Sequence, residues 1–469
     1  MKILMLRLRP PAETIGLQHL MIMEPLEFEV LASLAHKDDE VRIVDLILEK
    51  KSAKTFISLF QPDLLCLTGY ITHVATMIET AILAKRICPS VKVAAGGVHL
   101  EVCPADLDHP DIDYRVVRNP VTVFPLLLSS IRSGSGELPP GILRPGQTAE
   151  DLPQMDFAWA SPRRDLTKRY RRKYFYIFHS QVALMKTAFG CPFDCSFCFC
   201  RAITGGAYVQ RPLSDVVDEL ESIAETNIYI VDDDFLVSRE RVQSFLTVIR
   251  ERGIRKKYLL YGRADFIAAN PDLIAEFAAL GLRTVIVGIE SFFEEELTAY
   301  NKHTSVEMNE KSLQVLRKNG VDVYATLILP PEWDTKKFRL CGDYLIRNHI
   351  KYVNLQPYTP LNGTGMKVNE DTLLIKRQDW AKWDLAHVII QPKNISVSEY
   401  YRQIIKLYQR VLFRPSVLLS YLLQYPPGLL LKMLAGSMTV RSQYIFKLNE
   451  ARALEKKLRT EIKKGIKNA

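Results

Sequence analysis

Three cysteines stand close together near the middle of the chain, at Cys191, Cys195 and Cys198. Iron–sulfur clusters are held by cysteine thiolates, and a C-x-x-x-C-x-x-C spacing lets three thiolates of one short loop face a single cluster. Three protein ligands on a 4Fe-4S cubane leave one iron open for a small molecule. The spacing therefore predicts a cluster held by these three residues.

Other uses of clustered cysteines fit the sequence less well. Structural zinc commonly takes four ligands from two C-x2-C pairs, and no second group of Cys or His follows this stretch. Cys200 would have to supply the fourth ligand through a C-x-C pair, so we interpret it as a small buried residue. Disulfides require an oxidising compartment, and the eight cysteines show no pairing rhythm.

Strands and helices alternate around and after the cysteines. A repeated strand–helix pattern predicts parallel strands with their carboxyl ends at one edge, where (β/α) barrels carry their chemistry. Six such units predict a partial (β/α)6 barrel. The expected strands are 182–189, 227–231, 257–262, 284–288, 323–329 and 352–356.

The cysteine spacing after an apolar strand resembles the radical S-adenosylmethionine (SAM) superfamily, in which the open iron binds the amino and carboxylate groups of SAM. Three later strand ends carry further elements of that family in the same order. They are Val231-Asp-Asp-Asp-Phe235, Gly262-Arg-Ala-Asp265 and Gly288-Ile-Glu-Ser291. Each element alone also fits a helix cap, a turn or an ion pair.

The resemblance implies a role for each of these strand-end residues. Asp233 and Asp234 would accept hydrogen bonds from the SAM ammonium, which is a charge-assisted contact. Arg263 would bind the SAM carboxylate, because its planar fork suits that group better than lysine does. Glu290 and Ser291 would line the ribose and methionine of SAM.

Residues 1–135 show a second, shorter strand–helix rhythm. The expected strands 2–8, 41–47, 64–70, 91–95 and 114–117 predict a parallel sheet covered on both faces. Ligands of such sheets bind beyond the carboxyl ends of the strands. Thr68 and Gly69 lie at one of these ends and Gly96 and Gly97 at another, where glycines let the backbone approach a ligand.

In front of a radical SAM core, this sheet resembles the cobalamin-binding domain of the cobalamin-dependent radical SAM subclass. The segments behind the resemblance are Met23–Ser33, Val41–Asp45 and Ala95–His99. The D-x-H-x-x-G signature that supplies an axial histidine elsewhere is absent, which implies cobalamin bound without a protein histidine. His73 and His99 are candidates for the lower face, although we interpret each as a surface or hydrogen-bonded loop histidine.

The expected fold is therefore α/β, in four parts. A doubly wound, Rossmann-like cobalamin-binding domain (1–135) is followed by a linker (136–182), a radical SAM partial barrel (183–365) and a helical C-terminal domain (366–469) that faces substrate or membrane. In the last part, Trp380–Ile390 is predicted to be helical. Two apolar runs, 417–423 and 429–434, have basic residues on both sides, which fits an interfacial helix or a cap packed on the barrel.

Charge and composition limit the partners. The net charge is +9, with basic clusters at 163–173 and from Lys456 onward, and such clusters bind nucleic acid or anionic lipid or form solvated faces. No nucleic-acid module accompanies them. No signal peptide and no apolar run of spanning length is found. We expect a cytoplasmic protein with no nucleic-acid partner and at most peripheral contact with a membrane.

In detail the resemblance is to the hopanoid methylase type, through Arg171-Arg-Lys-Tyr-Phe175, Tyr229-Ile-Val-Asp-Asp233 and Trp333-Asp-Thr-Lys-Lys-Phe338. Phe199-Cys200 departs from that pattern. The resemblance implies a cobalamin-dependent methyltransferase acting on an unactivated carbon of a small, lipid or terpenoid-like substrate through a 5′-deoxyadenosyl radical and methylcobalamin. An electron donor such as ferredoxin or flavodoxin would reduce it. Two alternatives stay open: cyclisation or oxidation with the same cofactors, and a sensor or carrier that does not cleave SAM.

Overall fold

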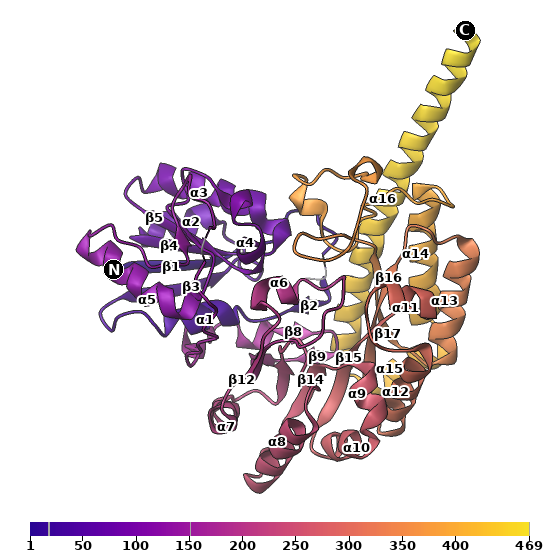
Figure 1. Ribbon diagram of the computed structural model, residues 1–469, viewed down its shortest axis with the longest axis horizontal. Coiled ribbons are helices and arrows are strands. Elements are labelled where there is room, and N and C mark those ends of the chain that lie inside the picture. The colour runs from indigo at the N-terminus through magenta and orange to yellow at the C-terminus, as the bar shows by residue number, and fades with distance from the viewer. Residues whose placement is uncertain (17–18, 151, 469) are drawn as a thin grey trace.

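Two α/β bodies lie side by side, and helices from the end of the chain run along the second (Figure 1). The computed structural model describes residues 1–16, 19–150 and 152–468, with side chains through Glu461. Each body is built on a six-stranded sheet. The α/β fold class predicted from the sequence is confirmed.

The first sheet has the strand order β3-β1-β4-β5-β6-β7. All neighbours are parallel except β6 and β7. The strand order reverses between β1 and β4, and doubly wound sheets bind ligands beyond the carboxyl ends of such strands. The strands are β1 (Lys2–Arg7), β3 (Glu40–Asp45), β4 (Leu64–Thr68), β5 (Lys92–Gly96), β6 (Tyr114–Val116) and β7 (Ile142–Leu143).

Helices cover both faces of this sheet because the strand side chains alternate in direction. Leu4 and Leu6 of β1 pack in one core with α2 and α3, while Ile3 and Met5 pack in another core with α1 and α5. The helices are α1 (Leu26–Ala32), α2 (Ala53–Phe60), α3 (Val74–Ile87), α4 (Val98–Val102) and α5 (Pro120–Ser133).

The second sheet is a partial barrel of six parallel strands in chain order. Its strands are β10 (Val182–Met185), β13 (Asn227–Ile230), β14 (Lys257–Tyr261), β15 (Leu282–Glu290), β16 (Asp322–Leu329) and β17 (Tyr352–Pro357). The connecting helices are α7 (Leu213–Ser222), α8 (Arg239–Glu251), α9 (Ala264–Ala269), α10 (Pro271–Ala279), α11 (Glu294–Ala299), α12 (Val306–Lys318) and α13 (Thr335–Arg347). Tyr229, Tyr324 and Tyr352 belong to one buried cluster with Tyr176.

Several short elements flank the cysteine stretch or precede the first barrel strand. β11 (Ala188–Gly190) pairs antiparallel with β12 (Tyr208–Gln210), and α6 (Cys200–Thr204) lies between them in sequence. A three-stranded sheet is formed by β2 (Met21–Ile22), β8 (Phe175–Tyr176) and β9 (His179–Ser180).

A buried ionic cluster joins the two bodies. Arg164 contacts Glu24 of the first body at 2.7 Å and Glu219 of α7 at 2.9 Å. Arg171 pairs with the same Glu24 and, at 2.6 Å, with Glu225. The Glu24 side chain is fully buried. Part of the basic cluster at 163–173 is therefore used inside the protein rather than for an external anion.

Three helices close the chain: α14 (Val397–Leu412), α15 (Pro415–Gln424) and α16 (Pro427–Asn468). α14 packs against α13 and α16, and the end of α16 projects away from the body of the molecule (Figure 1). Within the described residues, no helix combines the length and the apolar character needed to cross a membrane.

The helix predicted over Trp380–Ile390 is wrong. Only one 3-10 turn forms there, at Trp380–Lys382. The Asp384 side chain accepts hydrogen bonds from the backbone N–H groups of Ala386 and His387, at 3.0 and 2.9 Å. Leu385 between them adopts a left-handed φ of 62°. A local side-chain turn thus replaces the helix, as aspartate often allows.

Candidate active site

The cysteine loop begins directly after β11 and ends at α6. Gly190 precedes it with a φ of 77°, and a Cβ there would lie 1.9 Å from the carbonyl oxygen of Ala207, so only glycine fits. The loop is held by two segments of the barrel, the end of α11 and the loop after β17. Ser196 N–H donates to the Tyr300 carbonyl at 2.9 Å, and Gly365 N–H donates to the Ser196 carbonyl at 2.7 Å.

The spacing of the three thiols fits a cluster better than a single metal ion. Cys191, Cys195 and Cys198 are free and half-buried. Among the described residues, only one trio of His, Cys, Asp or Glu has all its ligand atoms within 4.8 Å of one another, and it is not this one. Thiolates around one tetrahedral zinc lie about 3.8 Å apart, given a Zn–S bond of about 2.3 Å. The wider spacing leaves room for a polynuclear centre.

The thiols differ in their surroundings. Burial raises the pKa of Cys191 to about 12, whereas a hydrogen bond from the Cys200 thiol lowers the pKa of Cys198 to about 7. Arg263 Nη1 lies 3.7 Å from Cys195 Sγ. A metal centre displaces the proton from each thiol that it binds. Cys200 itself is buried, which agrees with its interpretation from the sequence.

Of the three consecutive aspartates, two hold the local structure. Asp232 accepts from the backbone of Thr187 and Ala188, at 2.6 and 3.0 Å, and so fixes the turn between β10 and β11. Asp233 accepts from Gly190 N–H at 3.1 Å. Both contacts orient the start of the cysteine loop.

The third aspartate has a free acceptor. Asp234 Oδ1 accepts from Leu236 N–H at 3.0 Å, but its buried Oδ2 has no hydrogen-bond partner in the described structure. Burial raises the pKa of Asp234 to about 7. A buried polar atom without a partner is costly, and a cationic donor would satisfy it. Asp234 Oδ2 would therefore suit the ammonium group of SAM as a hydrogen-bond acceptor.

Arg263 is more fully engaged than the sequence suggested. Its Nη2 donates to the Lys302 carbonyl at 2.8 Å and to Asp265 at 2.9 Å. Its guanidinium carbon lies 3.6 Å from the ring centre of Phe193 in the cysteine loop. The side chain thus also holds the cysteine loop in place, besides any contact with a ligand carboxylate.

Glu290 and Ser291 lie at the end of β15, where the pairing with β16 shifts register. Glu290 is buried with a left-handed φ of 59°. Ser291 Oγ donates to Glu296 at 2.5 Å and accepts from Phe293 N–H at 3.1 Å. The serine hydroxyl therefore holds the turn after β15.

One residue of this site was missed in the sequence. Lys302 is buried, its Nζ lies 3.5 Å from Glu290 Oε1, and it stands 5.4 Å from the ring centre of Phe197 in the cysteine loop. Lys302 lies in the loop after α11, far along the sequence from any strand end, so the motifs at the strand ends did not indicate it. A lysine two residues after a buried tyrosine is not distinctive.

The predicted residues of the first sheet also come together. Gly97 has a φ of 105°, and a Cβ there would lie 2.8 Å from Thr68 Oγ1 and 2.9 Å from the Gly69 carbonyl oxygen. The loops after β4 and β5 therefore touch at these glycines. Gly96 lies at the end of β5, where a Cβ would meet only Val116 at 3.9 Å. Thr68, Gly69, Gly96 and Gly97 thus form one edge beyond the strand ends.

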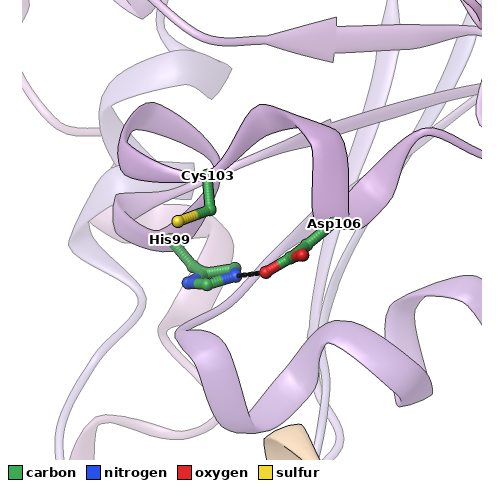
Figure 2. A group of neighbouring side chains, drawn as sticks. All are labelled: His99, Cys103 and Asp106. Carbon is green, nitrogen blue, oxygen red and sulfur yellow. Dashed lines mark hydrogen bonds and ion pairs between the residues drawn. The ribbon is translucent and has the colours of Figure 1, made fainter. Parts of the chain in front are cut away.

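The two candidate histidines differ. His99 is buried and its Nε2 lies 2.8 Å from Asp106 Oδ2, with Cys103 beside them (Figure 2). It is thus a hydrogen-bonded histidine, the interpretation favoured from the sequence. His73 Nδ1 lies 3.1 Å from Thr72 Oγ1, and burial lowers the pKa of His73 to about 4, which keeps its ring neutral.

The strand ends of the two sheets lie next to each other. α4, which follows β5 in the first body, packs against α6, which follows the cysteine loop. A Cβ at Gly363, in the loop after β17, would lie 2.6 Å from Val102 of α4 and 3.0 Å from Ala202 of α6. Both sheets therefore present their carboxyl ends to the same region, beside the cysteine loop.

A cavity of about 430 Å³ lies against Cys195 and Cys198. Arg201 of α6 and Gly363, in the loop after β17, also line it. The cysteine loop is therefore accessible to small molecules as well as fixed by its neighbours.

Two family models match the chain over these bodies. The model for the radical SAM superfamily matches residues 185–339, and the model for the B12 binding domain matches residues 14–128. The chain therefore contains a B12 binding domain followed by a radical SAM domain, in the order predicted from the sequence. These domains confirm the predicted cofactors, which are an iron–sulfur cluster, SAM and cobalamin.

Two known proteins are similar to most of the chain. A hopanoid C-3 methylase of Methylococcus capsulatus is 29% identical over 402 residues, which are 84% of this chain and 77% of that protein. An anaerobic magnesium-protoporphyrin IX monomethyl ester cyclase of Rubrivivax gelatinosus is 23% identical over 406 residues, 81% of this chain and 70% of that protein.

A solved structure has the same fold. The radical SAM methyltransferase TsrM of Kitasatospora setae, with cobalamin and a 4Fe-4S cluster bound, matches with a TM-score of 0.66 at 17% identity. The match covers 97% of this chain and 99% of that one. This chain and TsrM thus share their overall fold.

Proposed function

We propose that this protein is a cobalamin-dependent radical SAM enzyme that methylates an unactivated carbon of a small, lipid or terpenoid-like substrate. The observation that carries the proposal is the meeting of the strand ends of the two sheets, where α4 of the first body packs against α6 beside the cysteine loop. Val102 of α4 also lies beside Gly363, which lines the cavity at Cys195 and Cys198. Two cofactors and a substrate carbon would meet there.

Bound there, the cluster with SAM would supply a 5′-deoxyadenosyl radical that removes a hydrogen atom, and cobalamin would supply the methyl group. The protein positions these groups and excludes water. Cys191, Cys195 and Cys198 would hold the cluster, and Asp234 Oδ2 would accept from the SAM ammonium. Arg263 and Glu290, which internal contacts already hold in place, would form walls of the SAM site.

Four further parts of the proposal rest on the sequence. The domain division at residues 135, 182 and 365 follows the two strand rhythms. The edge formed by Thr68, Gly69, Gly96 and Gly97 would contact cobalamin. Asp233, whose side chain is partly exposed, and Ser291 would contribute to the SAM site. An electron donor such as ferredoxin or flavodoxin would reduce the cluster.

The similarity to a hopanoid C-3 methylase supports a lipid-like substrate and methyl transfer. The similarity to a cyclase supports the alternative, in which the substrate is cyclised or oxidised without a methyl group. The lipid-like substrate also suits contact with a membrane surface, which is part of this proposal.

The test is an anaerobic SAM cleavage assay with a strong reductant, after reconstitution with iron, sulfide and hydroxocobalamin. We expect 5′-deoxyadenosine from the wild type and none from Cys195→Ala. Cys103→Ala is the matched control, because this thiol is equally half-buried but lies in the first body. A reconstituted cluster without SAM cleavage under several reductants would refute the proposal.

The mass of the product separates the two reactions. With a hopanoid as substrate, methylation adds one CH2, whereas cyclisation or oxidation removes two hydrogens. Conversion of soluble substrates only would refute the lipid-like substrate while leaving the radical chemistry in place.

A further inference from the structure

The short helix α15 turns its apolar face outward. Leu418, Leu419, Leu422 and Leu423 repeat at the i, i+1, i+4, i+5 spacing of one helix face, and all are exposed, up to 79% for Leu423. On the opposite face Val417 is buried. A soluble helix normally shows the reverse arrangement, with charged residues toward water.

The next helix also exposes apolar residues. Leu431, Leu434 and Met438 of α16 lie at i, i+3 and i+7 and are exposed, with Leu431 at 67%. Met433 and Tyr444 of the same helix are buried. α15 and α16 pack against each other across a turn of two residues. We call these seven exposed residues the leucine face.

The chain around the leucine face carries only positive charge. Residues 400–449 contain seven Lys and Arg and no Asp or Glu. Three of the seven pair with carboxylates outside this segment. Among the described side chains, no carboxylate lies within ion-pair distance of the other four, which are Lys406, Arg414, Lys432 and Arg441. Two of these are also held by the protein, since Arg414 donates to the Val411 carbonyl at 3.0 Å and Lys432 Nζ lies 3.1 Å from the ring centre of Phe175. The leucine face is therefore flanked in the chain by positive charge alone, which we call its positive rim.

The leucine face lies at the end of the barrel opposite the cysteine loop. Tyr421 OH donates to the Lys351 carbonyl at 2.9 Å, and Tyr425 stacks on Phe178 at 4.1 Å between ring centres. Lys351 immediately precedes β17, so α15 packs at the amino ends of the strands. An electron donor must approach the cluster at the carboxyl ends, so it is not the occupant of this face.

We propose that the leucine face docks on the surface of an anionic lipid bilayer. Exposed leucines would enter the headgroup boundary, and the basic residues would contact anionic headgroups. Self-association is disfavoured, because a symmetric contact brings two identical positive rims together. This inference rests on the proposed function and names the surface through which the proposed membrane contact would form. It does not depend on the identity of the substrate.

Flotation of the reconstituted full-length protein with vesicles tests the inference. One set of vesicles is phosphatidylcholine alone, and the other is phosphatidylcholine with phosphatidylglycerol. We expect binding to the mixed vesicles that weakens at high salt, because salt screens the headgroup attraction. The double variant Leu419→Ser/Leu423→Ser should bind at least about tenfold more weakly, since each lost leucine removes apolar burial. Leu59→Ser, on α2 with 73% of the leucine exposed, should bind like the wild type.

Each contrary result overturns the inference. Equal binding of wild type and double variant would place the contact elsewhere. Absence of binding to both vesicle types would exclude a bilayer as occupant. If the wild type is a dimer by light scattering and the double variant a monomer, the leucine face is an interface between copies. SAM cleavage is assayed in the same samples, so failure of membrane docking and failure of the radical chemistry are read separately.

Discussion

Lys302 and Glu290 form an ion pair inside the barrel, with 3.5 Å between Nζ and Oε1 and about 6% of each residue exposed. Lys302→Met should destabilise the protein by about 3–5 kcal/mol, because it leaves a buried carboxylate without its partner. Lys302→Arg keeps the charge and should cost less. Urea unfolding of the metal-free protein measures both, and equal stability of wild type and Lys302→Met would contradict this prediction.

The stability of the protein should depend on pH through Asp234. Burial raises the pKa of Asp234 from 3.8 to about 7. Because the pKa of Asp234 is higher in the folded than in the unfolded protein, its contribution to the free energy of unfolding is fully present below pH 3.8. That contribution is lost as the pH rises toward 7. Asp234→Asn should remove this loss, which is roughly 4 kcal/mol at most.

Urea midpoints of both metal-free proteins across this pH range test the prediction. The wild type should lose stability relative to the variant as the pH rises. Parallel curves would show that Asp234 does not titrate as its burial implies.

Cys200 should prove dispensable for the cluster. It is buried, and its N–H lies 3.4 Å from Cys198 Sγ. Cys200→Ala keeps that backbone contact, so iron and sulfide content after reconstitution should match the wild type. Cys198→Ala should lose most of both. Loss of iron in Cys200→Ala would instead make this thiol a ligand.

Gly97 should be far less tolerant of a side chain than Gly134. Both have positive φ, but a Cβ at Gly97 meets Thr68 and Gly69, while nothing lies within 4 Å of one at Gly134. Gly134→Ala should cost about 1 kcal/mol from backbone strain alone. Gly97→Ala should cost about 2 kcal/mol more and weaken cobalamin binding.

Urea unfolding and equilibrium dialysis with hydroxocobalamin measure the two effects. Equal costs for the two variants would mean that the loops after β4 and β5 can separate.

Much of the fold could be read from the sequence because buried parallel strands are short apolar runs. The run 64–70 predicted β4 within two residues, and the run 227–231 predicted β13 within one. The segment Trp380–Ile390 failed because a single side chain, Asp384, captured the backbone N–H groups that a helix would use. The pattern of apolar and polar residues along the chain does not reveal that a side chain competes with a helix for the same N–H groups.

The candidate site was predictable where it follows strand ends and not where it depends on distant contacts. Asp234 lies four residues after β13 and Glu290 ends β15, so their positions near the carboxyl ends of the strands could be expected. Lys302 meets Glu290 only because the loop after α11 folds back over the cysteine loop. The engagement of Arg263 with Asp265 and the Lys302 carbonyl likewise appears only in three dimensions.

The buried ionic cluster around Glu24 has a consequence for how molecules enter and leave. Opening the two bodies like a hinge would separate Arg164 and Arg171 from carboxylates in both, at a cost of several kcal/mol for each stranded charge. Exchange of SAM and substrate would then depend on movement of the loops at the strand ends rather than on separation of the two bodies. The spacing of the two cofactor compartments becomes a fixed dimension of the molecule, and substrates of different size would be accommodated by the side chains between them.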